Sequence, residues 1–280
     1  MIEYLQSLND FIQFDFLQRA LIGTLLLSLC SGILSPFIVA KKYAFIGSAV
    51  SHSTLLGLSL TIGVLGLSTP YVIFLTLLAI TLMLNLFLAY STYKDRIPAD
   101  SLIGIFFTAT MGLGIIIHGL VGKNSSELVS YLFGNILLID NGDLLISSLL
   151  LIIVSLSIFP LFKKWIYTTF DPEGAQVSGI STKAFHYGFF LLITLVIVSA
   201  VKLSGTVLIN TLLIMPGVFA LKMGRNIKSV FVYSILFCLF TSTFGLSIAN
   251  FFDQPSGATM TVIQFAVLGV FYLYRKVSKA

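Results

Sequence analysis

The feature that most constrains this chain is a succession of apolar runs, each long enough to cross a membrane. A helix needs about 20 mostly apolar residues to cross the hydrocarbon core. The sequence contains nine such runs, at about residues 16–40, 45–65, 71–90, 102–121, 144–162, 185–201, 205–221, 230–250 and 258–274. Charged residues make up only 10% of the chain, whereas a soluble domain holds about 25%. The sequence therefore predicts an all-α polytopic membrane protein with eight to nine transmembrane helices, forming one transmembrane domain over residues 1–280.

The basic residues predict how the chain is oriented. Lys and Arg concentrate in short cytoplasmic loops. If the Lys41/Lys42 pair lies inside, alternation of the spans places 13 of the 16 basic residues inside and only Arg19, Lys123 and Lys202 outside. This pattern predicts an outer N-terminus and a cytoplasmic C-terminus. The net charge of +5 thus reflects the inner loops and indicates no nucleic-acid surface. The segment YLFGNILLID, residues 131–140, is too short to cross, and we expect it to be re-entrant or interfacial.

Acidic residues gather on the predicted outer face. A negative outer face favours the approach of cations, and Glu127 and Asp253 are the candidates to receive them. The alternative is that acidic residues fill the positions that basic residues leave.

The longest inner loop contains FDPEGAQVSGI, which has the signals of a short helix. Asp171 can N-cap it, Pro172 suits its first position, Glu173 suits its positive first turn, and Gly179 can end it in the left-handed conformation. The helix is either an ordinary surface helix or a docking site for a cytoplasmic partner. The chain has no phosphate-binding loop of the G-x-x-x-x-G-K-[ST] type, so ATP-driven work would need another chain.

The stretch GSAVSHSTLLG places polar side chains inside an apolar run. Ser48 and His52 are four residues apart and share a helix face, which Ser51 and Thr54 broaden. An ionisable residue inside a membrane is by default a functional hypothesis, although a structural hydrogen bond to a neighbouring helix is the alternative. His118 and His186 fall near the ends of their spans, where we expect them to be interfacial. A zinc protease would need further ligands such as H-E-x-x-H, which this chain lacks, so enzymatic activity is not expected.

Several motifs, in order, resemble those of one family. They are AFIGSAVSHSTLLG, ELVSYLFGNIL, FDPEGAQVSGI, GTVLINTLLIMPGVFA and NFFDQPSGATM. Over residues 16–276 the chain is similar to the permease subunits of bacterial ABC importers for zinc and manganese, and its ending resembles the zinc type.

The resemblance implies a homodimer in the bacterial cytoplasmic membrane. Two copies would form the path, ATPase subunits would dock beneath, and a periplasmic or lipid-anchored binding protein would deliver the metal. The family's coupling helix matches Asp171, Pro172, Glu173, Gly174, Ala175 and Gly179.

The same resemblance makes His52 a contact for the transported metal, with Ser48 and Ser51 lining the path. Ser48 stands where the family has Asp. Imidazole suits zinc and carboxylate suits manganese, so we expect zinc as cargo and no bound cofactor. The alternatives are a manganese or iron importer permease of the same family, or a secondary metal carrier.

Overall fold

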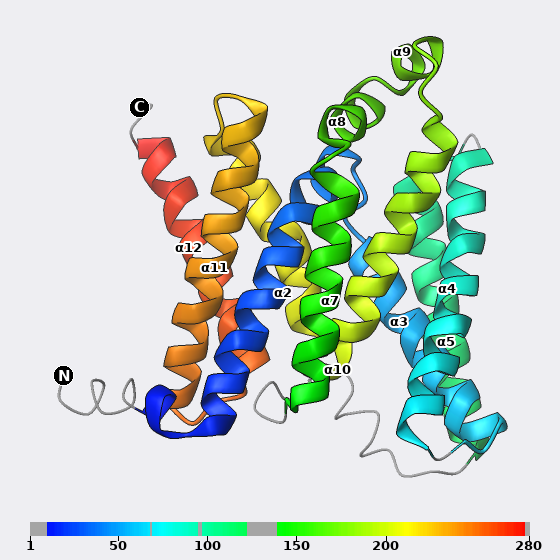
Figure 1. Cartoon of the computed structure of the whole chain (residues 1–280), viewed down its shortest axis with the longest axis vertical. Helices are drawn as coiled ribbons and strands as arrows, with labels where there is room; N and C mark the ends of the chain where they lie inside the picture. The colour runs from blue at the N-terminus through cyan, green and yellow to red at the C-terminus, as the bar shows by residue number, and fades with distance from the viewer. Residues whose placement is uncertain (1–9, 68, 95–96, 122–138, 278–280) are drawn as a thin grey trace. The chain divides into compact units, whose positions relative to one another are not determined.

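The fold is built from helices wherever the chain is described. The computed structural model describes residues 10–67, 69–94, 97–121 and 139–277, and every regular element in these ranges is helical (Figure 1). This confirms the predicted all-α class. The long helices are α2 (Asp15–Ala40), α4 (Pro70–Lys94), α5 (Ala99–Val121), α7 (Asn141–Ile158), α10 (Thr182–Met223), α11 (Ile227–Phe251) and α12 (Ser256–Val277). The shorter ones are α3 (Ile46–Leu58), the π-helix η1 (Ser59–Val64), α8 (Phe162–Phe170) and α9 (Pro172–Val177).

Eight helical segments of the described chain are long and apolar enough to cross a membrane. The predicted span at residues 45–65 is instead a composite of α3 and η1. Its backbone changes from the α to the π pattern at Ser59, and the Leu65 amide donates to the carbonyl of Leu60, five residues earlier, at 3.0 Å. The two segments together run from Ile46 to Val64, so the structure fits the prediction of eight to nine spans.

Helix α10 supplies two of the spans because it is broken near its middle. Gly205 has φ 73° and ψ 169°, outside the helical region. This combination is open almost only to glycine, since a Cβ atom would clash with the backbone. The break separates Thr182–Val201 from Ser204–Met223, close to the predicted boundary between spans 185–201 and 205–221.

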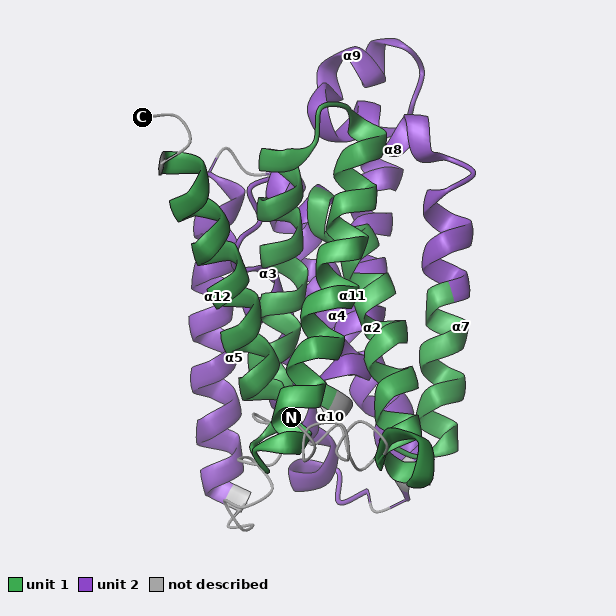
Figure 2. Cartoon of the chain, turned by 90° about the vertical axis from the view of Figure 1, so that its left-hand side faces the viewer, with its two compact units in different colours: residues 1–36, 132–151, 202–280 green, residues 37–131, 152–201 purple. Residues whose placement is uncertain are grey.

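The chain divides into two compact units (Figure 2). Unit 1 comprises residues 1–36, 132–151 and 202–280, and unit 2 comprises residues 37–131 and 152–201. The divisions fall within α2, α7 and α10, so these helices contribute to both units. In unit 1, α11 packs against α12, and in unit 2, α3 packs against α4 and α5. The predicted single domain stays a prediction.

Within unit 1, Ser35 of α2 bonds to the backbone of α10 beside a proline that interrupts its hydrogen bonding. Pro216 lies inside α10 and has no amide hydrogen to donate. The next amide, that of Gly217, donates to the Ser35 hydroxyl at 2.7 Å, and this hydroxyl lies 3.5 Å from the carbonyl oxygen of Ile214. A Cβ atom on Gly217 would come within 2.6 Å of the Ser35 carbonyl oxygen. Serine thus satisfies backbone groups that proline disturbs, as membrane helices require.

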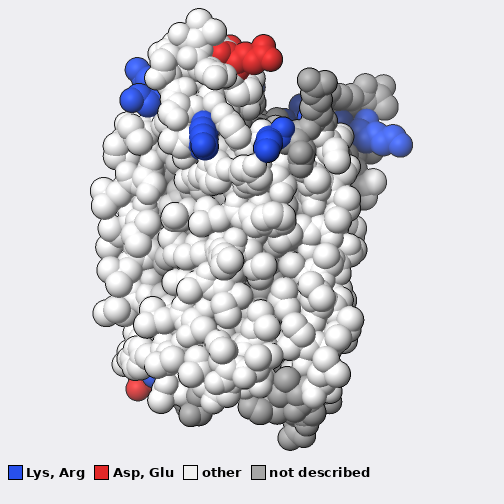
Figure 3. All heavy atoms as spheres, turned by 90° about the vertical axis from the view of Figure 1, so that its right-hand side faces the viewer, with Lys and Arg blue, Asp and Glu red and all other residues white. Residues whose placement is uncertain are grey.

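The charged side chains that the structure describes lie near the ends of the candidate membrane spans. On the face in Figure 3, the described Lys residues of unit 2 gather toward its α9 end, and the band below them carries no charge among the described residues of that unit. Such a band suits the hydrocarbon core. Glu127 and residues 131–138 of the predicted re-entrant segment lie outside the described residues. Ile139 and Asp140 directly precede α7, and Asp140 accepts a hydrogen bond from the Asp143 amide at 2.7 Å.

Candidate functional site

Helix α3 carries buried polar groups through the interior of unit 2. Eleven of its thirteen residues are buried, including Ser51 and His52. The His52 side chain is 9% exposed, and its ring meets the ring of Phe107 on α5 edge-on, with centroids 4.9 Å apart. Among the described residues, neither His52 Nδ1 nor the Ser51 hydroxyl has a hydrogen-bond partner. A buried polar atom without a partner costs about 1–3 kcal/mol, so these two groups need an explanation other than packing.

The hydroxyl groups on the other side of α3 are satisfied within the protein. Ser53 and Thr54 donate to the carbonyl of Val50 at 2.7 and 2.9 Å. Ser53 also accepts a hydrogen bond from the Asn85 amide group of α4 at 2.9 Å. Serine and threonine commonly bond their own helix in this way. Thr54 therefore does not extend the open polar face as the sequence predicted, and that face is reduced to Ser48, Ser51 and His52.

Ser48 lies one helical turn before His52 and is half-buried. Residues four apart on a helix are neighbours on its surface. The structure thus keeps Ser48 and His52 on one face of α3, as predicted.

A polar pair on α4 was missed by the sequence analysis. The Asn85 amide group donates to the carbonyl of Thr81 at 2.8 Å. Asn85 Oδ1 and the Thr81 hydroxyl are buried and have no partner among the described residues. The signal was present, because a single asparagine four residues after a threonine interrupts an apolar span. This pair faces α3 from the side of Ser53, whereas His52 faces α5.

The described part of the chain does not hold a complete metal site. It contains no group of three or more His, Cys, Asp or Glu side chains able to hold a metal ion. His186 has a structural environment: its Nε2 lies 3.0 Å from the Ala89 carbonyl oxygen and 3.2 Å from the Thr92 hydroxyl. His186 lies in the second turn of α10, near the start of its span as predicted, and only 9% of the side chain is exposed. His118, in the last turn of α5, also has a buried Nε2 without a partner among the described residues. His52 is thus the histidine with an open nitrogen on the polar face of α3.

Asp253, the second predicted acceptor of incoming cations, is exposed in the turn between α11 and α12. Its φ of 51° places it in the left-handed region, which aspartate adopts more readily than most residues. Asp253 belongs to unit 1, whereas Ser48, Ser51 and His52 belong to unit 2.

The second candidate site is the short helix α9, which forms as the sequence predicted. Asp171 Oδ1 accepts a hydrogen bond from the Gly174 amide at 2.9 Å, and Pro172 occupies the first turn. Gly179 has φ 76°, and the next amide, that of Ile180, donates back to the Ala175 carbonyl at 3.0 Å. Both ends of α9 are thus closed by local bonds, and Ala175 is fully buried.

The outer surface of α9 combines acidic and apolar groups. Asp171, Pro172 and Glu173 are exposed. Val177 is 90% exposed and Phe170, just before the helix, is 61% exposed. Large apolar side chains so open to water are typical of a surface that a partner covers. The sequence analysis did not predict that Val177 and Phe170 are exposed, because a single apolar residue does not indicate which way its side chain faces.

Comparison with known proteins gives matches along almost the whole chain. The profile of the ABC 3 transport family matches residues 13–275. The chain is 30% identical to the manganese transport system membrane protein MntC of Listeria monocytogenes, over 95% of this chain and 93% of that protein. It is 31% identical to the high-affinity zinc uptake system membrane protein ZnuB of Haemophilus influenzae, over 94% and 98%. Among solved structures, "PsaBC from Streptococcus pneumoniae in complex with Fab" matches with a TM-score of 0.81 and 30% identity, over 96% and 95%.

Proposed function

The chain belongs to the ABC 3 transport family and is a multi-span permease subunit of an ABC-type metal importer, and from this premise we propose that it carries zinc past His52. ATP is hydrolysed by a separate ATPase subunit and not by this chain. An importer driven by such a subunit replaces the secondary carrier that the sequence left open.

The observation that carries the proposal is the open nitrogen of His52 in a buried helix. Nδ1 has no partner among the described residues, and the Ser51 hydroxyl beside it has none either. A passing cation or its water would satisfy both groups. Neutral imidazole is a good ligand for zinc, and a path must hold its ion loosely enough to release it. One imidazole with hydroxyl groups and no carboxylate suits this balance.

The choice of zinc rests on the ligand types. Relatives named for manganese and for zinc are about equally similar to this chain, at 30% and 31% identity. Ser48 replaces the carboxylate that would suit manganese, and imidazole remains. Manganese is the second candidate, favoured by the name of the relative MntC.

A second copy of the chain would complete the site. The described residues of one copy supply two imidazoles with an unpartnered buried nitrogen, those of His52 and His118, of which only His52 lies on the polar face of α3, and no larger ligand cluster. A two-fold axis beside α3 would bring two His52 side chains to one ion, because such an axis presents the same surface from both copies. We therefore infer a homodimer with the path at its interface.

Helix α9 is the proposed contact with the ATPase subunit. Its closed caps make it rigid, and Glu173 and Val177 are exposed for a partner. A rigid helix loses little entropy on binding and can transmit force. A binding protein, periplasmic or lipid-anchored, would deliver the metal at the opposite face.

The proposed membrane is the bacterial cytoplasmic membrane, with α9 and the C-terminus inside and the N-terminus outside. The support is the concentration of Lys and Arg at the α9 end of unit 2 and at the end of unit 1 that carries Lys222 and Arg275. In a variant without Cys30 and Cys238, Lys164→Cys and Gln254→Cys should react with an impermeant thiol reagent from opposite sides. Reaction of Lys164→Cys from outside would reverse the topology.

Uptake of radioactive zinc and manganese, normalised to folded permease, tests the cargo. We expect zinc uptake to fall at least about tenfold in His52→Gln, as for other losses at metal sites, with His118→Gln as the matched control. Ser48→Asp should shift the preference toward manganese. Equal zinc uptake in all these variants would refute the role of His52.

A further inference from the structure

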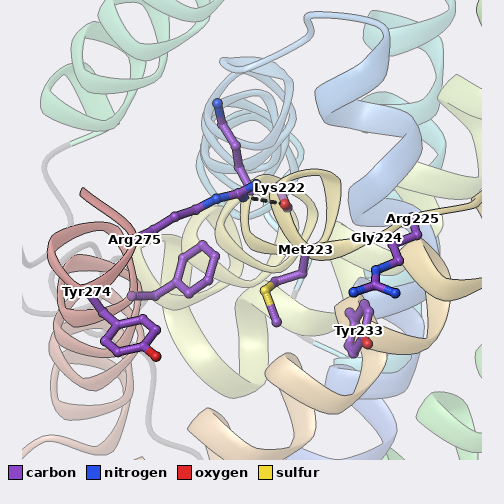
Figure 4. A pocket seen from close by; sticks show the side chains of 8 residues that line it. Lys222, Met223, Gly224, Arg225, Tyr233, Tyr274 and Arg275 are labelled. Atoms are coloured by element: carbon purple, nitrogen blue, oxygen red, sulfur yellow. Dashed lines mark hydrogen bonds between the residues drawn. The ribbon is translucent and has the colours of Figure 1, made fainter. Parts of the chain in front are cut away.

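A cavity of about 530 Å³ lies in unit 1, where the turn after α10 meets α11 and the end of α12 (Figure 4). It is lined by Lys222, Met223, Gly224, Arg225, Tyr233, Phe271, Tyr274 and Arg275. Its volume is within the range of small-molecule sites, about 300–1,000 Å³. The cavity belongs to neither candidate site described above.

The cavity gathers cations without a compensating carboxylate. Three of its lining residues are Lys or Arg, and none is Asp or Glu. The described acidic residues of unit 1 lie before α2, at the start of α2 and α7, and in the turn between α11 and α12, at the opposite helix ends; they are Asp10, Asp15, Asp140, Asp143 and Asp253. Part of the Arg275 guanidinium is already used within the protein, because it donates a hydrogen bond to the carbonyl of Lys222 at the end of α10. Lys222 and Arg225 contribute the other two positive charges of the lining.

An exposed apolar stripe begins at the same cavity and runs along α11. Tyr233 lines the cavity, and Leu236, Phe240 and Phe244 follow at three-, four- and four-residue steps. This spacing places all four on one helix face. Leu236 is 54% exposed and Phe240 61% exposed. A ligand that covers the whole surface therefore needs an anionic head and a hydrocarbon tail.

We propose that this cavity binds the phosphate head group of an anionic phospholipid, with an acyl chain along the α11 stripe. In the proposed orientation the lipid belongs to the cytoplasmic leaflet. Basic pockets between transmembrane helices on that side recognise such head groups. A second copy of the chain fits this surface less well, because a two-fold symmetric contact would place the same cations of both copies opposite each other, where they repel. A free phosphate would leave the stripe uncovered.

The test uses the full chain purified in detergent. Dioleoyl phosphatidylglycerol is titrated, and binding is read from native mass spectrometry and from the thermal unfolding midpoint. Dioleoyl phosphatidylcholine tests the head-group charge. Glycerol phosphate and inorganic phosphate test whether the tails are needed.

The variants remove charge at and beside the cavity. Each surface cation contributes about fivefold to binding an anionic lipid, so Lys222→Gln with Arg225→Gln should weaken phosphatidylglycerol binding about thirtyfold. Lys228→Gln is the matched control, an exposed cation at the same end of unit 1 that does not line the cavity. If the double variant does not fold, Arg225→Gln alone should weaken binding about fivefold.

Three results would overturn the proposal. Equal binding of phosphatidylcholine would remove the role of charge. Equal binding of glycerol phosphate or inorganic phosphate would make this a site for a free anion. If Lys228→Gln weakened phosphatidylglycerol binding as much as Arg225→Gln does, the effect would come from the general positive charge of the surface and not from the cavity.

Discussion

Replacing His52 by phenylalanine separates a transport role from a packing role. Phenylalanine keeps an aromatic ring against Phe107 but removes the buried Nδ1 that has no partner among the described residues. Removing such an atom gains about 1–3 kcal/mol, and the slightly larger ring costs about 1 kcal/mol through overpacking. We therefore expect the free energy of unfolding to be unchanged or raised by up to about 2 kcal/mol. Zinc uptake per folded molecule should nevertheless fall at least about tenfold.

His186→Phe is the matched control, because His186 is also 9% exposed and belongs to the same unit. Its Nε2 lies within hydrogen-bond distance of the Ala89 carbonyl oxygen and the Thr92 hydroxyl. Losing this bonding should cost about 1 kcal/mol of stability and leave zinc uptake per folded molecule unchanged.

The assay pairs thermal unfolding of the purified chain with uptake of radioactive zinc, both normalised to the monodisperse protein. Two results would refute the reasoning. His52→Phe could carry zinc at the normal rate, which would exclude a metal contact. It could instead lose as much stability as His186→Phe, which would make His52 a structural bridge between helices.

The remaining predictions concern α9, Lys41 and Gly205. Val177→Asp and Glu173→Lys should each weaken co-purification with the ATPase subunit about tenfold. Because both positions are exposed, each substitution should change the free energy of unfolding by less than about 0.5 kcal/mol. Normal co-purification would argue against docking at α9. Burial lowers the pKa of Lys41 from 10.5 to about 8, so between these values the unfolded chain binds more protons and stability should rise with pH. This rise in stability should disappear in Lys41→Gln but persist in Lys42→Gln, as measured by thermal unfolding between pH 8 and 10. Burial raises the pKa of the Tyr43 phenol to about 12, so above this pH range Tyr43 lowers stability as the pH rises. Gly205→Ala should destabilise the chain by about 1–3 kcal/mol because of its φ of 73°. Gly188→Ala, in the helical part of α10, should not, because the added Cβ atom would lie 3.7 Å from its nearest neighbour, an ordinary contact; equal unfolding midpoints of the two variants would show that the break in α10 does not depend on glycine.

The class of the protein and the local form of α9 could both be predicted from the sequence. Long apolar runs without charge must become helices in a membrane, because a helix satisfies its backbone groups internally. The caps of α9 were predictable for the same local reason, since Asp171, Pro172 and Gly179 act through bonds within a few residues. The His52 position followed from the four-residue spacing to Ser48 and from the resemblance of the motif.

Which polar groups remain without a hydrogen-bond partner could not be predicted, because it depends on how the helices pack. Ser51, Ser53 and Thr54 look alike in the sequence, yet Ser53 and Thr54 are bonded and Ser51 is not, because the bonding depends on helix rotation and on Asn85 of a neighbouring helix. The change to a π-helix at Ser59 and the cation-lined cavity at the α10–α11 turn also depend on contacts between distant segments. Hydropathy reports how long a segment is and how apolar, whereas the partners of each side chain depend on which helices pack together.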